Sequence, residues 1–260
     1  MLQIVWFKRD LRIRDHEPLS RAAAQGPVLP LYIVEPGLWR QPDASGRHWG
    51  FLREGLVCLR EELAGLGQPL LIRQGDAVEV LRELIERHPV ASVWSHQETG
   101  NAWTFGRDRA VDAMLRERAI PWHQVRQHGV VRGRTDRDRW SKQWEQLMTA
   151  PLATPPALQG LSYTDPGGIP DWPSQRLAAD PCPGRQLGGR SAAEQALVSF
   201  LDERGRRYHL EMSSPSTAVG SCSRLSAHLA TGAISMREVV QRTRLRRAEI
   251  RQMAAARRST

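Results

Sequence analysis

Short apolar runs alternate along the first half of the chain with stretches whose apolar residues recur every three or four positions. The runs are rich in β-branched and aromatic residues, as buried strands are, and they occupy residues 3–7, 28–34, 70–73, 91–94 and 121–126. The helical period recurs between them, over residues 47–66, 77–87 and 102–118. This alternation indicates βαβ units with right-handed crossovers, so we expect residues 1–131 to form one α/β domain, a Rossmann-like parallel sheet covered on both faces.

The periodic pattern fades between residues 132 and 190. Proline, glycine, alanine and aspartate become frequent there, as in APLATPPALQG and TDPGGIPDWP. This composition predicts a long surface connector. Within it, Trp140 and Trp144 are four residues apart and would share one face of a single amphipathic turn, where they either cover the sheet domain or stack on a ligand.

Residues 191–260 show only the helical period, which predicts a second, all-helical part. Ser191 and Glu194 have the spacing of a capping box, and the apolar stripe that follows runs to Gly205, a plausible stop. We therefore expect a helix over residues 191–204.

A second capping box, formed by Ser235 and Glu238, predicts another helix near the end of the chain. Gly232 lies just before it and is expected to end the helix that contains Arg224 to Thr231. Two helices should thus meet at a glycine turn.

The composition and the cysteine spacing exclude several classes of protein. The chain has no run of eighteen apolar residues, and its first residues lack the order of an export signal, so we expect no membrane segment and a cytoplasmic protein. The three cysteines, Cys58, Cys182 and Cys222, are widely spaced and have no partner at metal-ligand spacing. We therefore expect neither disulfides nor a metal site.

The net charge of +9 is concentrated near the end of the chain. From residue 237 onward there are eight arginines against two glutamates, which is 8 − 2 = +6. This stretch is either a solvated helix face or a contact for nucleic acid or phosphate.

Open parallel sheets bind ligands at the carboxyl ends of their strands, which directs attention to the segments that follow the predicted strands. These segments are Lys8–Asp15, Glu35–Trp39, Gly75–Asp76 and His96–Trp103. No G-x-G-x-x-G follows a strand and no G-x-x-x-x-G-K-[ST] occurs, so the dinucleotide turn of NAD enzymes and the P-loop of ATPases are both excluded.

A cluster of hydroxyls marks the predicted helix start in the segment SCSRLSAHLATG, residues 221–232. The first turn of a helix carries unpaired amides and partial positive charge, so Ser223, Arg224 and Ser226 could hold a phosphate or pyrophosphate there. The alternative is that one serine is an ordinary helix cap. The spacing leaves both interpretations open.

Three segments, in order along the chain, resemble the DNA photolyase/cryptochrome family. SRLSAHLATGAIS at 223–235, with Tyr208 before it, is similar to the opening of that family's flavin domain. WFKRDLR at 6–12 with Asp15 resembles its first strand and loop, and ETG at 98–100 with Arg107 and Asp108 resembles its fourth strand and following helix.

The resemblance implies an all-α FAD-binding domain whose first helices occupy residues 191–260. It also implies that the pyrophosphate of FAD is held at the serine-rich helix start, with these residues as the cofactor site: Tyr208, Cys222, Ser223, Arg224, Leu225 and Ser226. The family commonly has threonine where this chain has Cys222, which removes one hydroxyl donor. A folate or deazaflavin antenna chromophore would lie near His96–Arg107 and Glu35–Trp39, and neither ligand is assigned.

Family members are roughly twice as long as this chain, and by the resemblance their flavin-reducing tryptophans and most of their DNA-binding surface would lie beyond residue 260. All nine tryptophans here lie at or before Trp172. We therefore expect an incomplete helical domain, from a truncated, fragmentary or split protein, that contains no catalytic residue and is inactive alone.

The resemblance predicts a blue-light-dependent photolyase, a carbon–carbon lyase that acts as a monomer on UV-damaged DNA. It would split cyclobutane pyrimidine dimers by electron transfer from reduced FAD. Two alternatives remain open: a cryptochrome-type photoreceptor without repair activity, and a helix-turn-helix DNA-binding protein formed by residues 224–247.

Overall fold

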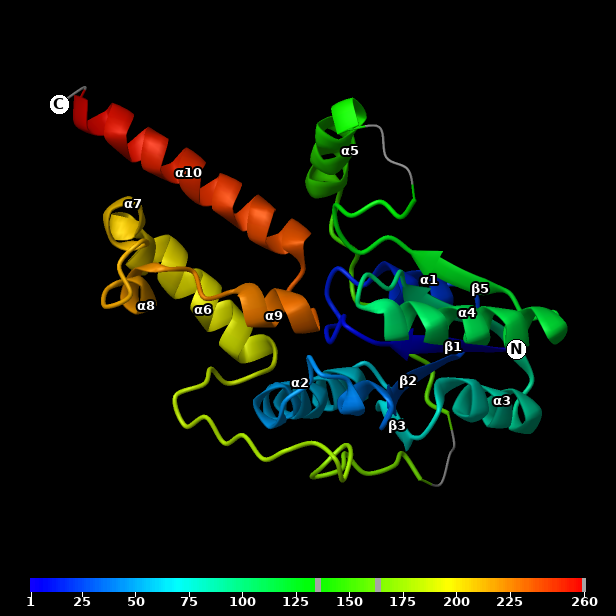
Figure 1. Cartoon of the computed structure of the whole chain (residues 1–260). Helices are drawn as coiled ribbons and strands as arrows, with labels where there is room; N and C mark the ends of the chain where they lie inside the picture. Colours follow the sequence, from blue (N-terminus) through cyan, green and yellow to red (C-terminus); the bar gives the residue numbers. More distant parts are fainter. Residues whose placement is uncertain (134–136, 162–164, 259–260) are drawn as a thin grey trace.

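The computed structural model describes residues 1–133, 137–161 and 165–258. In this part of the chain five parallel strands form one sheet in the order β3-β2-β1-β4-β5 (Figure 1). The strands are β1 (Leu2–Phe7), β2 (Val28–Val34), β3 (Leu71–Gln74), β4 (Val90–His96) and β5 (Trp122–Val125). All five predicted strands and their parallel arrangement are confirmed.

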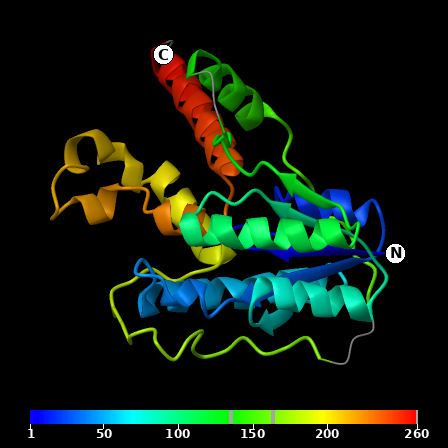
Figure 2. The ribbon, with the colours of Figure 1, turned by 45° about the vertical axis from the view of Figure 1, so that its right-hand side comes forward.

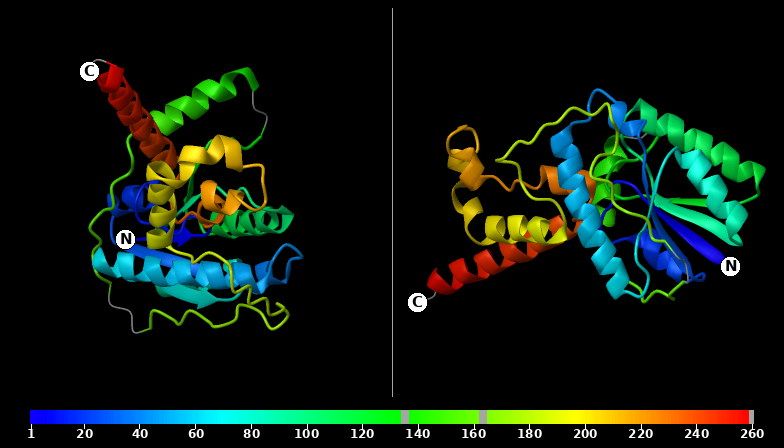
Figure 3. Two further views of the ribbon diagram at one scale, coloured as in Figure 1. Left: turned by 90° about the vertical axis from the view of Figure 1, so that its left-hand side faces the viewer. Right: turned by 90° about the horizontal axis from the view of Figure 1, so that it is seen from below.

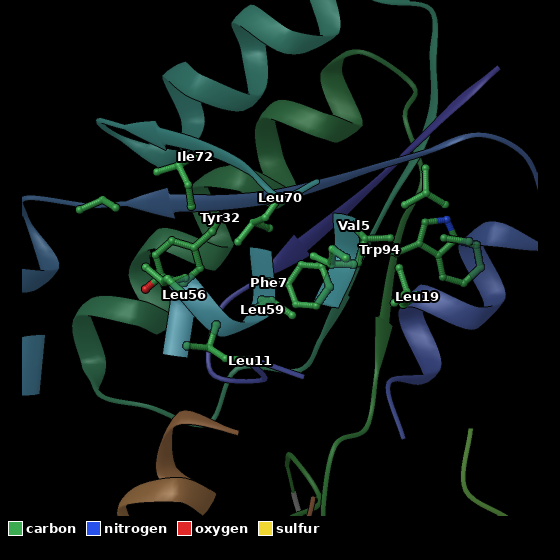
Figure 4. Close-up of a cluster of buried hydrophobic side chains, with 14 of the residues drawn as sticks. Val5, Phe7, Leu11, Leu19, Tyr32, Leu56, Leu59, Leu70, Ile72 and Trp94 are labelled. Atoms are coloured by element: carbon green, nitrogen blue, oxygen red, sulfur yellow. The ribbon is translucent and has the colours of Figure 1, made fainter. Parts of the chain in front are cut away.

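Two helices cover each face of the sheet. Buried apolar side chains of α1 (Glu17–Ala23) and α2 (Gly46–Gly65) pack on one face of the sheet. Those of α3 (Ala77–Arg87) and α4 (Ala102–Glu117) pack on the other face. Alternate residues of β1 point to opposite faces, so that Val5 and Phe7 contact the α1 and α2 side while Ile4 and Trp6 contact the α3 and α4 side. Figure 4 shows the first of these two cores.

Helix α1 was not expected from the hydrophobic pattern. It has seven residues, too few for a clear apolar stripe, and its start is set by a side chain. His16 accepts a hydrogen bond from the amide of Leu19 at 3.1 Å, and Pro18 lies in the first turn, where the missing N–H costs nothing.

The stretch expected to be a connector contains a full helix, α5 (Arg137–Thr149), where only one turn was predicted. The Trp140 indole donates to the carbonyl of Gly129 at 2.9 Å, and Trp144 lies beside it with ring centroids 6.3 Å apart. The two tryptophans therefore cover the segment that leaves the sheet.

Beyond α5, residues 150–189 form no helix or strand in their described part, yet they are not simply a surface loop. They pass beneath α2 and β3 in Figure 1, where the Leu158 amide donates to Leu66 and the Ile72 amide donates to Pro166, both at 2.8 Å. Leu158 and Leu177 join the sheet core. The connector thus also closes one side of the core, a role that its composition did not indicate.

The helical part contains α6 (Arg190–Asp202), α7 (Tyr208–Glu211), α8 (Ala218–Ser221), α9 (Ser226–Thr231) and α10 (Met236–Arg258). Two short 3₁₀ turns, η1 (Leu38–Arg40) and η2 (Arg204–Arg207), complete the described helical elements. The side chains of Arg257 and Arg258, counted above in the basic stretch, lie outside the described residues.

The helix expected over residues 191–204 is present, but its predicted ends are wrong. Helix α6 begins at Arg190, after Gly189 with φ of 88°, and the structure shows no side-chain cap there. Glu194 accepts instead from Arg190 at 2.7 Å, because that arginine is buried one turn before it. The helix ends at Asp202, and Gly205 lies in η2.

The second capping box is confirmed. The Ser235 hydroxyl accepts from the Glu238 amide at 3.0 Å, and the Glu238 carboxylate accepts from the Ser235 amide at 2.9 Å. Gly232 ends α9 with φ of 72°, as expected. Helix α9 itself is shorter than predicted, since it begins at Ser226 and not at Arg224.

The turn between α9 and α10 lies against the loop after β1. The Leu11 amide donates to Thr231 at 3.0 Å, Arg12 donates to Gly232 at 3.1 Å, and Arg237 is paired with Asp15 at 3.3 Å. These contacts fasten the helical part to the sheet domain.

Helix α10 projects away from the sheet (Figure 3). It packs beside α5, where Arg244 pairs with Glu145 at 2.6 Å (Figure 2). Further along α10, Leu245, Ile250 and Met253 are more than half exposed. None of the helices in the described part of the chain has the length and apolar character that a membrane crossing requires.

Candidate functional site

A cavity of about 700 Å³ lies at the carboxyl ends of β1, β2 and β4. Its floor comes from the sheet and the loops that follow these strands, and α2, the connector and α9 close it. The cavity lining includes Trp6, Lys8, Arg9, Tyr32, Glu35, Trp39, Phe51, Glu98, Arg107, Arg185, Arg224 and Ser226. The volume is within the range of sites for small organic ligands.

Aromatic rings line much of this cavity. Trp6 and Tyr32 come from the strands, Trp39 from η1 and Phe51 from α2. The Trp39 indole packs edge-on against Trp49, with ring centroids 5.1 Å apart, which holds its plane in place. Such walls suit a flat aromatic ligand.

A network of buried charges lies beneath the aromatic walls. The Arg107 guanidinium donates to Glu35 at 2.7 Å, to Glu98 at 3.0 Å and to Asp108 at 2.8 Å. Lys8 pairs with Asp108 at 3.2 Å. Three carboxylates therefore share two buried cations, and Arg107 is the group that holds them together.

Burial shifts the protonation equilibria of this network. Loss of water contact raises the pKa of Glu35 to about 7, although Arg107 opposes the shift. Burial also lowers the pKa of Lys8, against the attraction of Asp108. Burial acts to raise the pKa of Glu98, but the cations of Lys8 and Arg107 outweigh it and the pKa is lowered. Glu35 is thus the carboxyl group of this network that titrates near neutrality.

Two buried polar atoms in the cavity wall have no hydrogen-bond partner among the described residues. They are Oε1 of Glu35, in a residue only 3% exposed, and the indole Nε1 of Trp39, in a residue 6% exposed. Buried polar groups are nearly always paired, so these two atoms are exceptions among the residues that line the cavity.

A second buried cluster lies behind the loop after β1. Oδ2 of Asp10 accepts from His16 Nε2 at 2.9 Å and from His96 Nδ1 at 2.7 Å, and Oδ1 accepts from the Lys8 amide at 2.7 Å. Burial lowers the pKa of His96 to about 3, so its ring is neutral. Burial would raise the pKa of Asp10, but its two histidine partners hold that pKa well below the usual value.

The ligand atoms of Asp10, His16 and His96 are close enough to hold a metal ion. Nδ1 of His16, however, accepts from the Leu19 amide, so its proton must sit on Nε2. A metal on Nε2 would move that proton to the atom that caps α1. The cluster therefore acts as a hydrogen-bonded support for Asp10.

The predicted cofactor residues divide into two groups in the structure. Arg224 and Ser226 line the large cavity. Leu225 is buried in the small core of the helical part, together with Leu197 and Ile234.

The Arg204 side chain holds the backbone at Cys222 and Ser223 through hydrogen bonds. Arg204 donates to the carbonyl of Cys222 and, at 3.3 Å, to that of Ser223. Tyr208 follows directly after this turn and packs edge-on against Phe200, with centroids 5.8 Å apart. Tyr208 thus packs within the helical part and is not among the residues that line the large cavity.

The hydroxyls of Ser223 and Ser226 make no hydrogen bond within the described ranges, and neither caps α9. The interpretation that one serine is an ordinary cap therefore has no support in the structure. Arg224 adopts a left-handed backbone with φ of 58°, which is unfavourable for a non-glycine residue and is often found at functional sites.

Some residues of the site could be located from the sequence and others could not. The segments at Glu35–Trp39 and His96–Trp103 follow predicted strands, so their place at the sheet edge was expected. Phe51 and Arg185 carry no such signal, because one lies inside a helix and the other inside the connector. Only their packing brings them to the cavity.

Comparisons with known proteins agree with this geometry. The family model described as DNA photolyase matches residues 3–151. Cryptochrome DASH of Gloeobacter violaceus is 28% identical over 263 aligned positions, which cover 91% of this chain and 52% of that protein. The deoxyribodipyrimidine photo-lyase of Salmonella typhimurium is 28% identical over 269 positions, which cover 92% of this chain and 53% of the relative.

Solved structures share the fold. A class III photolyase from Agrobacterium tumefaciens superposes with a TM-score of 0.72 at 25% identity, over 91% of this chain and 52% of the other. A Synechocystis cryptochrome superposes with a TM-score of 0.78 at 20% identity, over 96% of this chain and 56% of the other. The chain spans about half the length of the curated relatives that it matches.

Proposed function

The chain belongs to the DNA photolyase family, and from this premise we propose that it supplies the sheet domain and first flavin-binding helices of a blue-light-driven DNA photolyase. The substrate is a cyclobutane pyrimidine dimer in UV-damaged DNA, flipped out of the duplex so that its bonds become accessible. The relative from Salmonella typhimurium, which carries the name deoxyribodipyrimidine photo-lyase, supports this choice of reaction.

The observation that carries the cofactor assignment is the serine-rich segment before α9. Its two serine hydroxyls make no hydrogen bond in the described structure, and Arg224 adds a positive charge beside them. This set of donors fits the pyrophosphate of FAD. Ser223, Arg224 and Ser226 would hold the phosphates, and Tyr208 would pack beside them.

Cys222 and Leu225 have lesser roles in this proposal. The Cys222 thiol is a weaker donor than the threonine hydroxyl of the family, and the Cys222 amide already donates to the carbonyl of Ala218 at 2.8 Å. Leu225 anchors the segment in the helical core. When bound and reduced, FAD would supply the light-excited electron that splits the dimer.

The part of the large cavity formed by the sheet domain, around Glu35 and Trp39 and away from Arg224 and Ser226, is the proposed site of a second, antenna chromophore. The aromatic walls there fit a flat heteroaromatic ring such as that of a folate or a deazaflavin. An archaeal photolyase from Sulfolobus tokodaii, with the same fold at 21% identity and a TM-score of 0.69, has been described with two FAD molecules, one implicated as a light-harvesting cofactor.

A cryptochrome-type photoreceptor is the second candidate, favoured by the relatives named cryptochrome DASH. The helix-turn-helix hypothesis is disfavoured by packing. Helix α9 has six residues and lies against the loop after β1, where the Leu11 amide donates to Thr231, so it is not a free partner for a recognition helix. A monomeric, cytoplasmic protein stays a prediction.

The cofactor assignment is tested by flavin retention. We expect the variant Ser223→Ala, Arg224→Ala, Ser226→Ala to bind FAD more weakly than the unaltered chain, with loss of Arg224 alone costing about 1 to 3 kcal/mol because a charge-assisted hydrogen bond disappears. The flavin band that survives gel filtration reports the affinity.

A matched control changes exposed residues of the same types, Ser213→Ala and Arg251→Ala, and should retain flavin fully. Equal flavin occupancy in the triple variant and the unaltered chain would remove the three residues from the site. Loss of dimers from UV-treated DNA under blue light, assayed with a reconstructed full-length protein that contains this chain, would select the photolyase over the photoreceptor.

A further inference from the structure

One arginine side chain ties the serine-rich segment before α9 to helix α6. Arg204, in η2, donates from Nε to the Ser199 hydroxyl at 3.0 Å and from Nη2 to the carbonyl of Ala196 at 2.8 Å. The same guanidinium donates to the carbonyls of Cys222 and Ser223, to the second at 3.3 Å. Four acceptors from two separate segments thus meet on a single planar group.

This contact fixes the direction of two successive peptide planes. A trans peptide unit points its N–H opposite to its C=O, and none of the described peptide bonds is cis. The carbonyls of Cys222 and Ser223 point to Arg204. The N–H groups of the same two planes belong to Ser223 and Arg224, so they must point away from it. Neither amide donates to an acceptor within the described ranges, which leaves two free donors side by side.

A third carbonyl of the segment is held from the connector. Nε2 of Gln186 donates to the carbonyl of Arg224 at 3.0 Å. Arg224 is the residue with the left-handed backbone, at φ of 58°. Such a conformation is unfavourable without glycine and persists only where the surrounding structure imposes it. Arg204 supplies that constraint before Arg224, and Gln186 supplies it after.

We infer that Arg204 is a positioning residue for the flavin phosphates, which holds the backbone at Ser223 and Arg224 in its phosphate-binding conformation without contacting the phosphates. This inference rests on the proposed flavin site and adds to it a residue outside the serine-rich segment. All three nitrogens of the Arg204 guanidinium already donate to protein acceptors. Arg224 and Ser226 line the large cavity, and Arg204 does not.

The benefit of such a residue is order before binding. Successive backbone amides that face one side form a concave site for an anion, provided that the backbone keeps its shape. Donors that are fixed in advance lose little conformational freedom when the ligand arrives. Without the Arg204 guanidinium, two carbonyls lose their partner and the left-handed residue is free to relax. Affinity for the phosphates should then fall, while affinity for the rest of the ligand should not.

The decisive comparison uses ligands that differ only in the phosphate-bearing part. FAD carries a pyrophosphate and riboflavin has no phosphate. We expect Arg204→Met to weaken FAD binding by the whole chain about tenfold and to leave riboflavin binding unchanged. ADP and adenosine provide the same comparison for the other half of FAD. Equilibrium dialysis measures all four constants, and a general loss of structure would lower all of them together.

A lysine variant separates position from charge. Arg204→Lys keeps the positive charge, but its single nitrogen cannot span acceptors on two segments as the planar fork does. We expect it to weaken FAD binding nearly as much as Arg204→Met, and both losses should persist at about 0.5 M salt, where exposed charges are screened. Full rescue by lysine would show that Arg204 acts through its charge and would overturn the positioning role.

The matched control is Arg206→Met. Arg206 lies in the same turn, is exposed and donates to the carbonyl of Asp202, outside the serine-rich segment. This variant should bind FAD as the unaltered chain does. Thermal melts establish that each variant is folded.

Nuclear magnetic resonance tests the same inference on the unaltered chain, so that it does not depend on the folding of a variant. Addition of ADP should shift the amide signals of Ser223 and Arg224 and leave the Nε–H signal of Arg204 in place. A shift of the Arg204 signal as large as those of the amides would mean direct contact with the phosphates and would contradict the inference.

The outcomes separate this inference from the proposed function. If the unaltered chain binds FAD no more tightly than riboflavin, and ADP no more tightly than adenosine, the proposed phosphate site and the role of Arg204 both fall. If the chain prefers the phosphorylated ligands and folded Arg204→Met keeps that preference, the flavin site stands and the positioning role is wrong.

Discussion

At the scale of single residues, the buried carboxylates at the cavity differ in their hydrogen-bond partners and in their pKa values. Arg107 reaches three carboxylates, and Glu35 is the one whose pKa is raised to about 7. The unpaired Oε1 of Glu35 lowers the stability of the folded chain, because a buried polar atom without a hydrogen-bond partner loses its hydration. Function and stability are in tension at this residue.

The Glu35 pKa predicts how stability depends on pH. In the folded chain Glu35 binds a proton below about pH 7, whereas in the unfolded chain it does so only below the ordinary glutamate pKa of 4.5. Acidification from pH 7 to 5 thus favours the folded state at this group, by about 2 kcal/mol. His96 acts in the opposite sense, since its pKa falls to about 3 on folding and the unfolded chain binds the proton first, below pH 6.5.

Removing the Glu35 titration should therefore make the chain more acid-sensitive. We expect Glu35→Gln to lose about 2 kcal/mol more stability than the unaltered chain between pH 7 and 5, measured by urea unfolding at each pH. Identical pH profiles for the two proteins would show that Glu35 does not carry the raised pKa.

At the scale of elements, the turn between α9 and α10 depends on glycine. Gly232 has φ of 72°, and a Cβ built on it would lie 2.3 Å from the carbonyl oxygen of Arg9. The backbone of the helical part thus approaches the loop after β1 more closely than any side chain allows. Hydrogen bonds at Leu11 and Arg12 complete this contact.

Substitution at this turn should loosen the helical part. Gly232→Ala should cost about 3 kcal/mol or more in the free energy of unfolding, because it combines an unfavourable backbone conformation with a clash against backbone atoms that cannot move freely. Gly168→Ala is the matched control, since its Cβ would meet nothing within 4 Å. Denaturant unfolding compares the two, and an equal effect would refute the importance of close approach.

At the scale of the whole molecule, the chain between α5 and α6 joins two parts while it also covers the first. The Trp49 indole donates to the carbonyl of Asp171 at 2.9 Å, and Arg185 pairs with Glu54 at 2.6 Å near the entrance to the helical part. Long stretches without helix or strand nevertheless open more easily than the sheet. The segment between α5 and α6 is therefore held to α2 at some residues and has accessible backbone at others.

Limited proteolysis should distinguish the anchored residues of this segment from the accessible ones. A nonspecific protease should cut first between residues 150 and 190, at exposed positions such as Gly184, while the buried neighbourhoods of Leu158 and Leu177 resist. Mass spectrometry of the early fragments identifies the sites. An early cut within residues 70–115 would contradict the division into a stable sheet domain and a connector.

The local pattern of the sequence was sufficient for the five strands of the sheet, for helices α2, α3 and α4, and for the turn at Gly232. Periodicity reports which face of a segment is buried, and a capping box such as Ser235 and Glu238 closes within four residues, so both can be recognised locally. Helix α1 and the start of α6 could not be predicted, because His16 and Arg190 act there through contacts formed by the fold.

Only the tertiary structure brings together the segments that form the walls of the cavity. Its walls combine the loop at Glu35, the helix at Phe51, the connector at Arg185 and the start of α9, segments that no local pattern relates. The sequence indicated a serine-rich helix start and a ligand-binding sheet edge as two separate features. Their meeting around one cavity required the docking of α9 on the loop after β1, because periodicity states that a face is buried and does not state against what.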